Sequence, residues 1–144
     1  MNALKFICTS LILFFVVSAC DMNEADPKSP LSGTNWILSE LCSTEGNFSP
    51  SGVTNYTISF DEVRYYGESF ANTFSAEYAI DGSNICVLDR STTLVGCECC
   101  ECELNSRYEK AVFEITHFDY TQSELKLFYS DTEYMLFYLD LSTD

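Results

Sequence analysis

Apolar and polar residues alternate along several short stretches of this chain. In the stretch 56–60, Tyr56, Ile58 and Phe60 fall on one face of an extended strand, and Thr57 and Ser59 fall on the other. A period of two is typical of a strand that buries one face. The other segments expected to form strands are 33–38, 63–66, 74–80, 85–88, 117–121, 125–129 and 134–139.

Turn residues separate these segments. The run Asp81-Gly82-Ser83-Asn84 predicts a hairpin turn, because Asp-Gly tolerates the positive φ that such turns need. Gly67 is expected to be a second turn, and the Gly-, Ser- and Asn-rich stretch 45–55 a loop. The segment 134–139 is apolar on both faces, which predicts a place in the middle of the packed structure.

One segment has the spacing of a helix instead. Between about Glu103 and Glu114, apolar residues recur three and four positions apart and form a stripe. Together with 9 Tyr and 11 Phe, which favour strands, the pattern predicts a mostly β (α+β) fold. We expect a curved antiparallel sheet or an open barrel-like domain with one helix packed across it.

The N-terminus has the pattern of a targeting peptide. Lys5 is followed by the apolar core 11–17 and by the small residues Ser18 and Ala19. The sequence Val17-Ser18-Ala19-Cys20 resembles a bacterial lipobox, which implies cleavage before Cys20 and acylation of that cysteine. The alternatives are an ordinary secretory signal with an incidental Cys20, or an uncleaved membrane anchor.

This interpretation divides the chain into three parts: a signal peptide at 1–19, a flexible tether at 20–32, and a domain at 33–144. We expect a lipid-anchored protein of the cell envelope, on the outer membrane and facing the periplasm or the surface. The inner membrane is the alternative location, because Asp21 follows the lipidated Cys and in enteric bacteria an Asp at this position favours retention in the inner membrane.

The formal net charge of −15 restricts the possible partners. Such an acidic surface repels phosphate backbones, so we expect no nucleic-acid binding. It could attract cations or a basic partner. The predicted partner is the membrane, through the lipid at Cys20, and no protein partner can be named.

Motifs in a fixed order resemble the META/HslJ-like domain family over about residues 31–139. The segment 31–38 (LSGTNWIL) resembles the family's opening L-x-G-T/x-W-x-L strand, and 91–97 (STTLVGC) resembles its S-T-x-M-A-C motif. The remaining matches are Ile58-Ser59-Phe60 followed by Gly67, then Asn72, Phe74 and Tyr78, Asp81-Gly82 with Ile85, the helix 108–115, Leu125-Lys126-Leu127 and Met135-Leu136-Phe137.

The chain departs from this family at its cysteines. Where the family has G-C-N, this chain has 68–72 (ESFAN) without a cysteine, and extra cysteines follow Cys97. The disulfide that members form between these motifs therefore cannot be transferred. The resemblance implies an envelope or stress-associated protein without catalytic residues.

Six cysteines remain once Cys8 has left with the signal peptide and Cys20 carries lipid. The candidates for disulfide bonds are Cys42, Cys86, Cys97, Cys99, Cys100 and Cys102. An oxidising envelope favours up to three bridges whose connectivity the sequence leaves open, although the adjacent Cys99 and Cys100 are disfavoured as a pair. The alternatives are redox-active thiols, or a metal such as Zn²⁺ or Cu(I) held by the thiolates of the segment 97–102.

Catalytic signatures are missing from the sequence. His117 is the only histidine, and its strand context predicts a structural role. Carboxylates at Asp61, Glu62, Glu101 and Glu103 lie close in sequence, but nothing implies the deep cleft that a glycosidase needs. We therefore expect no enzyme and no cofactor.

Two functional hypotheses follow besides the metal. The first is a structural, stress-related or interaction module of the envelope. The second is a small-ligand binder with an aromatic barrel mouth formed by residues such as Tyr56, Phe74 and Tyr78.

Overall fold

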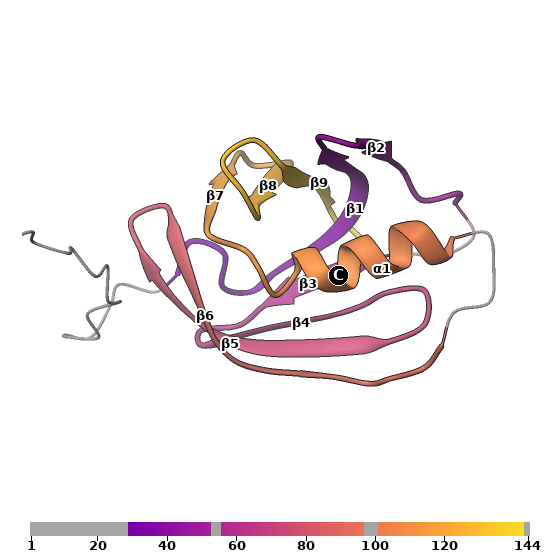
Figure 1. Ribbon diagram of the computed structural model, residues 1–144. Helices are drawn as coiled ribbons and strands as arrows, with labels where there is room; N and C mark the ends of the chain where they lie inside the picture. The colour runs from indigo at the N-terminus through magenta and orange to yellow at the C-terminus, as the bar shows by residue number, and fades with distance from the viewer. Residues whose placement is uncertain (1–28, 53–55, 97–100, 143–144) are drawn as a thin grey trace, which may run out of the picture.

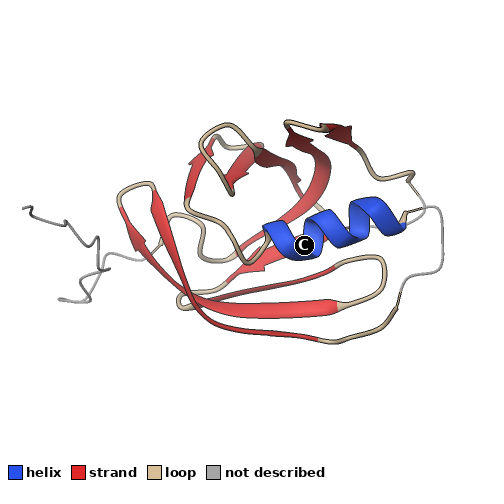
Figure 2. Cartoon of the chain, viewed as in Figure 1, coloured by secondary structure: helices blue, strands red, loops and turns tan. Residues whose placement is uncertain are grey.

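The computed structural model describes residues 29–52, 56–96 and 101–142. These residues form one antiparallel sheet and one helix (Figures 1 and 2). The elements in chain order are β1 (Thr34–Ser43), β2 (Gly46–Phe48), β3 (Thr57–Phe60), β4 (Arg64–Glu68), β5 (Thr73–Asp81), β6 (Asn84–Thr92), α1 (Cys102–Ala111), β7 (His117–Tyr120), β8 (Glu124–Phe128) and β9 (Tyr134–Leu139).

Eight of these strands close into a barrel. Each of β3 to β8 pairs with the next strand along the chain, and β1 pairs with β3 on one side and with β9 on the other. The β1–β9 register runs from Trp36 opposite Leu139 to Cys42 opposite Tyr134, with a bulge between Leu38 and Glu40. The predicted mostly β fold with one helix is confirmed, and the barrel is closed.

The weakest seam lies between β6 and β7, which share one register pair, Asn84 with His117. The two strands diverge beyond it, and α1 lies between the β3–β6 part of the barrel and the β7–β9 part (Figure 1). Tyr108 of α1 reaches both parts, since its ring lies 5.7 Å from Phe74 of β5 and 6.3 Å from Phe137 of β9. The helix therefore fills the region where the sheet separates.

Alternation along the strands selects the core. Tyr56, Ile58 and Phe60, which the alternation predicts to share one face, are all buried. The Asp81–Asn84 turn is also as expected, with Gly82 at φ +61.

Gly67 differs from its prediction, because it lies within β4 and not at a turn. A Cβ at this position would lie 1.9 Å from the Thr57 backbone oxygen and 2.7 Å from Cζ of Phe74. Glycine is required here for the close approach of β3 and for the Phe74 ring. The expected turn was therefore wrong, because a glycine that admits a neighbouring backbone has the same sequence signal as one that bends the chain.

Three further differences concern boundaries and burial. The expected loop 45–55 contains the short strand β2, which pairs with the end of β1. In β9, Met135 and Phe137 are buried but Tyr138 is 48% exposed, so only one face of this strand enters the core. Leu31, assigned to the tether from the sequence, is fully buried and belongs to the packed domain. Leu31 is part of the same hydrophobic core as the barrel residues, and the family-like motif begins at this position.

Candidate functional site

Aromatic side chains fill the barrel interior. Tyr56 lies edge-on to Tyr108, with ring centroids 5.2 Å apart, and both residues are fully buried. Phe74 and Tyr78 are also buried, and the Tyr78 hydroxyl donates to the Asp61 carbonyl at 2.7 Å. The mouth expected from Tyr56, Phe74 and Tyr78 is therefore occupied by the protein's own side chains.

The interior tyrosines keep hydrogen-bond partners. The Tyr65 hydroxyl donates to the Val112 carbonyl at 2.5 Å, and the Tyr108 hydroxyl donates to the Thr57 carbonyl at 2.8 Å. Burial raises the pKa of both phenols, so they stay protonated donors near neutral pH. These two bonds attach α1 and the chain just after it to β3 and β4.

A polar network fixes the same helix to the loop between β4 and β5. One oxygen of Glu109, Oε1, accepts from Ser69 Oγ at 2.5 Å, from Asn72 Nδ2 at 2.8 Å and from Asn105 Nδ2 at 3.0 Å. The Asn72 amide oxygen in turn accepts from the Val95 backbone N–H at 2.7 Å. Asn72 is one of the residues in the family-like motif, and it joins the loop, the helix and the chain after β6.

Glu101 is also committed to structure. It is 7% exposed and immediately precedes α1. Its carboxylate accepts from the Ser51 hydroxyl, from the Ser51 N–H at 2.9 Å and from the Tyr56 hydroxyl at 3.0 Å. The Ser51 hydroxyl is the main cause that lowers the pKa of Glu101. A carboxylate with these donors is held ionised and is a poor general acid.

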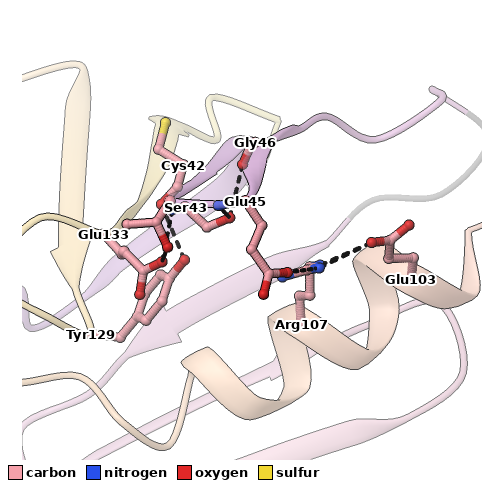
Figure 3. Close-up of polar contacts among 9 residues, drawn as sticks. Cys42, Ser43, Glu45, Gly46, Glu103, Arg107, Tyr129 and Glu133 are labelled. Atoms are coloured by element: carbon pink, nitrogen blue, oxygen red, sulfur yellow. Dashed lines mark hydrogen bonds and ion pairs between the residues drawn. The ribbon is translucent and has the colours of Figure 1, made fainter.

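The end of the β1–β2 hairpin is tied to two other elements (Figure 3). Arg107 of α1 pairs with Glu45 and with Glu103, and its guanidinium lies 4.4 Å from the Phe48 ring centroid. On the other side, the Thr44 N–H donates to Glu133 Oε1 at 2.9 Å. These are surface contacts that position the hairpin.

Cys42 lies in this region as a free thiol. Its sulfur is 3.4 Å from Glu40 Oε2, and the Tyr129 hydroxyl donates to its backbone carbonyl at 3.1 Å. Burial is the largest cause that raises the pKa of the Cys42 thiol, which therefore stays protonated and unreactive at neutral pH. The sequence placed Cys42 among the disulfide candidates, but the thiol sits between β1 and β9 on the barrel wall and forms no bridge.

Two other cysteines are disulfide-bonded, Cys86 in β6 and Cys102 at the start of α1. Cys20, Cys97, Cys99 and Cys100 lie outside the described residues. The hypothesis of a metal site in the segment 97–102 requires free thiolates as ligands. Cys102 cannot provide one, because its sulfur is part of a disulfide bond. Within 29–52, 56–96 and 101–142, no group of three or more His, Cys, Asp or Glu side chains could hold a metal ion.

The other candidates for chemistry are dispersed. His117 stacks on Phe128, with ring centroids 4.3 Å apart and planes 6° apart. The Asp61 carboxylate accepts the N–H groups of Val63 and Arg64 in the β3–β4 turn. Asp61, Glu101 and His117 thus each have a local structural contact.

A groove lies on the outer face of the barrel, and sequence reasoning missed it. Its volume is about 400 Å³, and its lining comes from β1, β3, β4, β5 and the residue after β9. The lining residues are Asn35, Trp36, Thr57, Ser59, Tyr66, Gly67, Glu68, Thr73, Phe74 and Asp140.

Register across the strands assembles this groove. Asn35 lies opposite Ser59, which lies opposite Tyr66, and this forms one row of outward side chains. Two residues along, Thr57 lies opposite Glu68 and Glu68 opposite Thr73. These rows of neighbouring side chains exist only because the strands pair in this register. The polar residues of each strand, taken one strand at a time, therefore did not reveal the groove.

The groove is acidic with one aromatic wall. Tyr66 is 50% exposed, and Glu68 and Asp140 provide carboxylates. The Ser142 hydroxyl and N–H donate to Asp140 at 2.6 and 2.9 Å and lower its pKa, so this carboxylate is ionised at neutral pH. No Lys, Arg or His lines the groove among the described residues.

The described chain is thus a small closed antiparallel barrel with one helix packed across it, a filled interior and an outer groove that carries two carboxylates. The same fold is found in an NMR structure of a protein from Burkholderia xenovorans, at 18% sequence identity and a TM-score of 0.64, covering 86% of this chain and 97% of that one. A second NMR structure matches at 18% identity and a TM-score of 0.57, covering 78% of this chain and 94% of the other.

The chain belongs to the META domain family, whose model matches residues 29–140. This confirms the resemblance found in the sequence. No curated protein matches the chain significantly. Among residues 29–52, 56–96 and 101–142, no helix is long and apolar enough to cross a membrane.

Proposed function

We propose that this META domain protein is a lipid-anchored, non-catalytic module of the bacterial cell envelope. The observation that carries the proposal is that Cys86 and Cys102 each take part in a disulfide bond. Disulfides persist in the periplasm and at the cell surface and are rare in the reducing cytosol. A bridged domain therefore fits the export that the segment 1–20 predicts.

The non-catalytic part is supported by how the ionisable groups are used. Glu101 and Glu109 each accept three hydrogen bonds that hold α1 in place, and His117 is stacked on Phe128. A general acid or base needs access to a substrate proton. Groups engaged in this way favour a structural or interaction module.

The test is the mass of the mature protein, extracted from envelope membranes of cells that express the full chain. The expected product begins at Cys20 and carries diacylglycerol on its thiol, with an additional acyl chain on the amine. Cys20→Ala is expected to abolish both lipid attachment and cleavage at this position. Cys8→Ala is the matched control in the same segment and is expected to leave both unchanged.

A mature chain that begins elsewhere, or an unmodified Cys20, would contradict the anchor. Density-gradient separation of inner and outer membranes locates the lipoprotein. Recovery with the outer membrane is the expected result, and recovery with the inner membrane would overturn that part of the proposal.

A further inference from the structure

We propose that the outer groove of the barrel binds an elongated aliphatic cation of the polyamine class. The site is the row Asn35, Ser59 and Tyr66 together with Thr57, Glu68 and Asp140. This proposal concerns the folded domain and does not depend on the lipid anchor.

Charge selects a cation. The described lining holds two carboxylates and no basic side chain, in a chain with a net charge of −15. Anionic ligands are repelled from such a surface, and cations are concentrated near it. The half-exposed Tyr66 ring adds a face on which an ammonium group or the methylenes beside it can pack.

The positions of the carboxylates select an elongated ligand. Asp140 is attached to β1, since its N–H donates to the Asn35 carbonyl at 2.8 Å, whereas Glu68 lies on β4 two strands further. With strands about 4.8 Å apart and residues about 3.4 Å apart along a strand, their Cα atoms are separated by roughly 15 Å. A single metal ion needs its oxygen ligands within about 2.6 Å, so the two carboxylates do not form one chelate.

The middle of the groove supplies neutral oxygen acceptors. The hydroxyls of Thr57 and Ser59 lie on β3, between the two carboxylates. A ligand with one ammonium near Asp140, another near Glu68 and a protonated amine between them matches this order. A monoamine could engage only one end.

The proposal is tested with spermidine and the full chain purified in detergent micelles. Calorimetric titration at low ionic strength measures the affinity, and backbone amide NMR shifts locate the site. We expect shifts concentrated at Ser59, Tyr66 and Gly67. The double variant Glu68→Gln/Asp140→Asn is expected to weaken binding at least tenfold, and Tyr66→Ala to weaken it severalfold.

The matched control is Glu62→Gln/Asp89→Asn, which removes the same two charges from exposed positions outside the groove. It is expected to change the affinity less than twofold. Equal weakening by both double variants would overturn the proposal, because it would indicate diffuse counter-ion attraction. Shifts that avoid the groove would overturn it too.

Two further probes separate other ligand chemistries. Mg²⁺ bound as tightly as spermidine, and lost in the same groove variant, would make this a metal site. Maltotriose binding that requires Tyr66 but not the two carboxylates would make it a site for neutral sugars. Either result would overturn the polyamine assignment, whereas absence of both supports it.

Discussion

Two adjacent tyrosines on β4 show how differently the two faces of this barrel are used. Tyr65 points inward and is fully buried, with its hydroxyl bonded to the Val112 carbonyl. Tyr66 points outward, is 50% exposed and forms a wall of the acidic groove. The residue type is the same, so the difference comes from the pleat of the strand alone. One face holds the fold together and the other is available to a ligand.

The largest expected effect is a difference in the free energy of unfolding between alanine substitutions on the inner and the outer face. Tyr65→Ala leaves a cavity among Phe60, Phe74 and Tyr78, whose ring centroids lie 5.8–6.4 Å from that of Tyr65, and should reduce the free energy of unfolding by about 3–5 kcal/mol. Tyr66→Ala removes an exposed side chain and should cost less than about 0.5 kcal/mol. Urea denaturation followed by circular dichroism measures both. Equal losses would show that the outer tyrosine is also part of the core.

The sequence predicted the inner face well because alternation is a local signal. The spacing of Tyr56, Ile58 and Phe60 alone places them on one face, which is the buried one, and Asp-Gly locates the β5–β6 turn. Each of these predictions needs only a few consecutive residues.

The features that sequence reasoning missed depend on contacts between distant residues. Closure of the barrel needs β1 to meet β9, about a hundred residues later, and β2 is recognisable only by its pairing with β1. The outer groove likewise needs Asn35, Ser59 and Tyr66 in register. Polar residues on an outward face look the same whether they line a groove or face bulk water.

A loss of stability of intermediate size is expected where β3 and β4 approach each other closely at Gly67. Gly67→Ala forces a methyl group against the Thr57 carbonyl and the Phe74 ring, and should cost about 1–3 kcal/mol. Gly96→Ala is the matched control, because a Cβ there meets no atom within 4 Å. Its expected cost is below about 0.5 kcal/mol. Thermal unfolding of the two variants under identical conditions makes the comparison, and a neutral Gly67→Ala would mean that the strands separate easily.

The smallest expected effect comes from removing one tyrosine hydroxyl on each face. Tyr65→Phe keeps the buried ring but leaves the Val112 carbonyl without this donor, which should cost about 1 kcal/mol. Tyr66→Phe keeps the groove wall and should leave both the free energy of unfolding and the spermidine affinity unchanged, because the ring supplies the packing surface. Urea denaturation and calorimetric titration of the two variants measure these quantities. If Tyr66→Phe weakened spermidine binding as much as Tyr66→Ala, the phenol oxygen rather than the ring face would be the contact, and the outer tyrosine would resemble the inner one in acting through its hydroxyl.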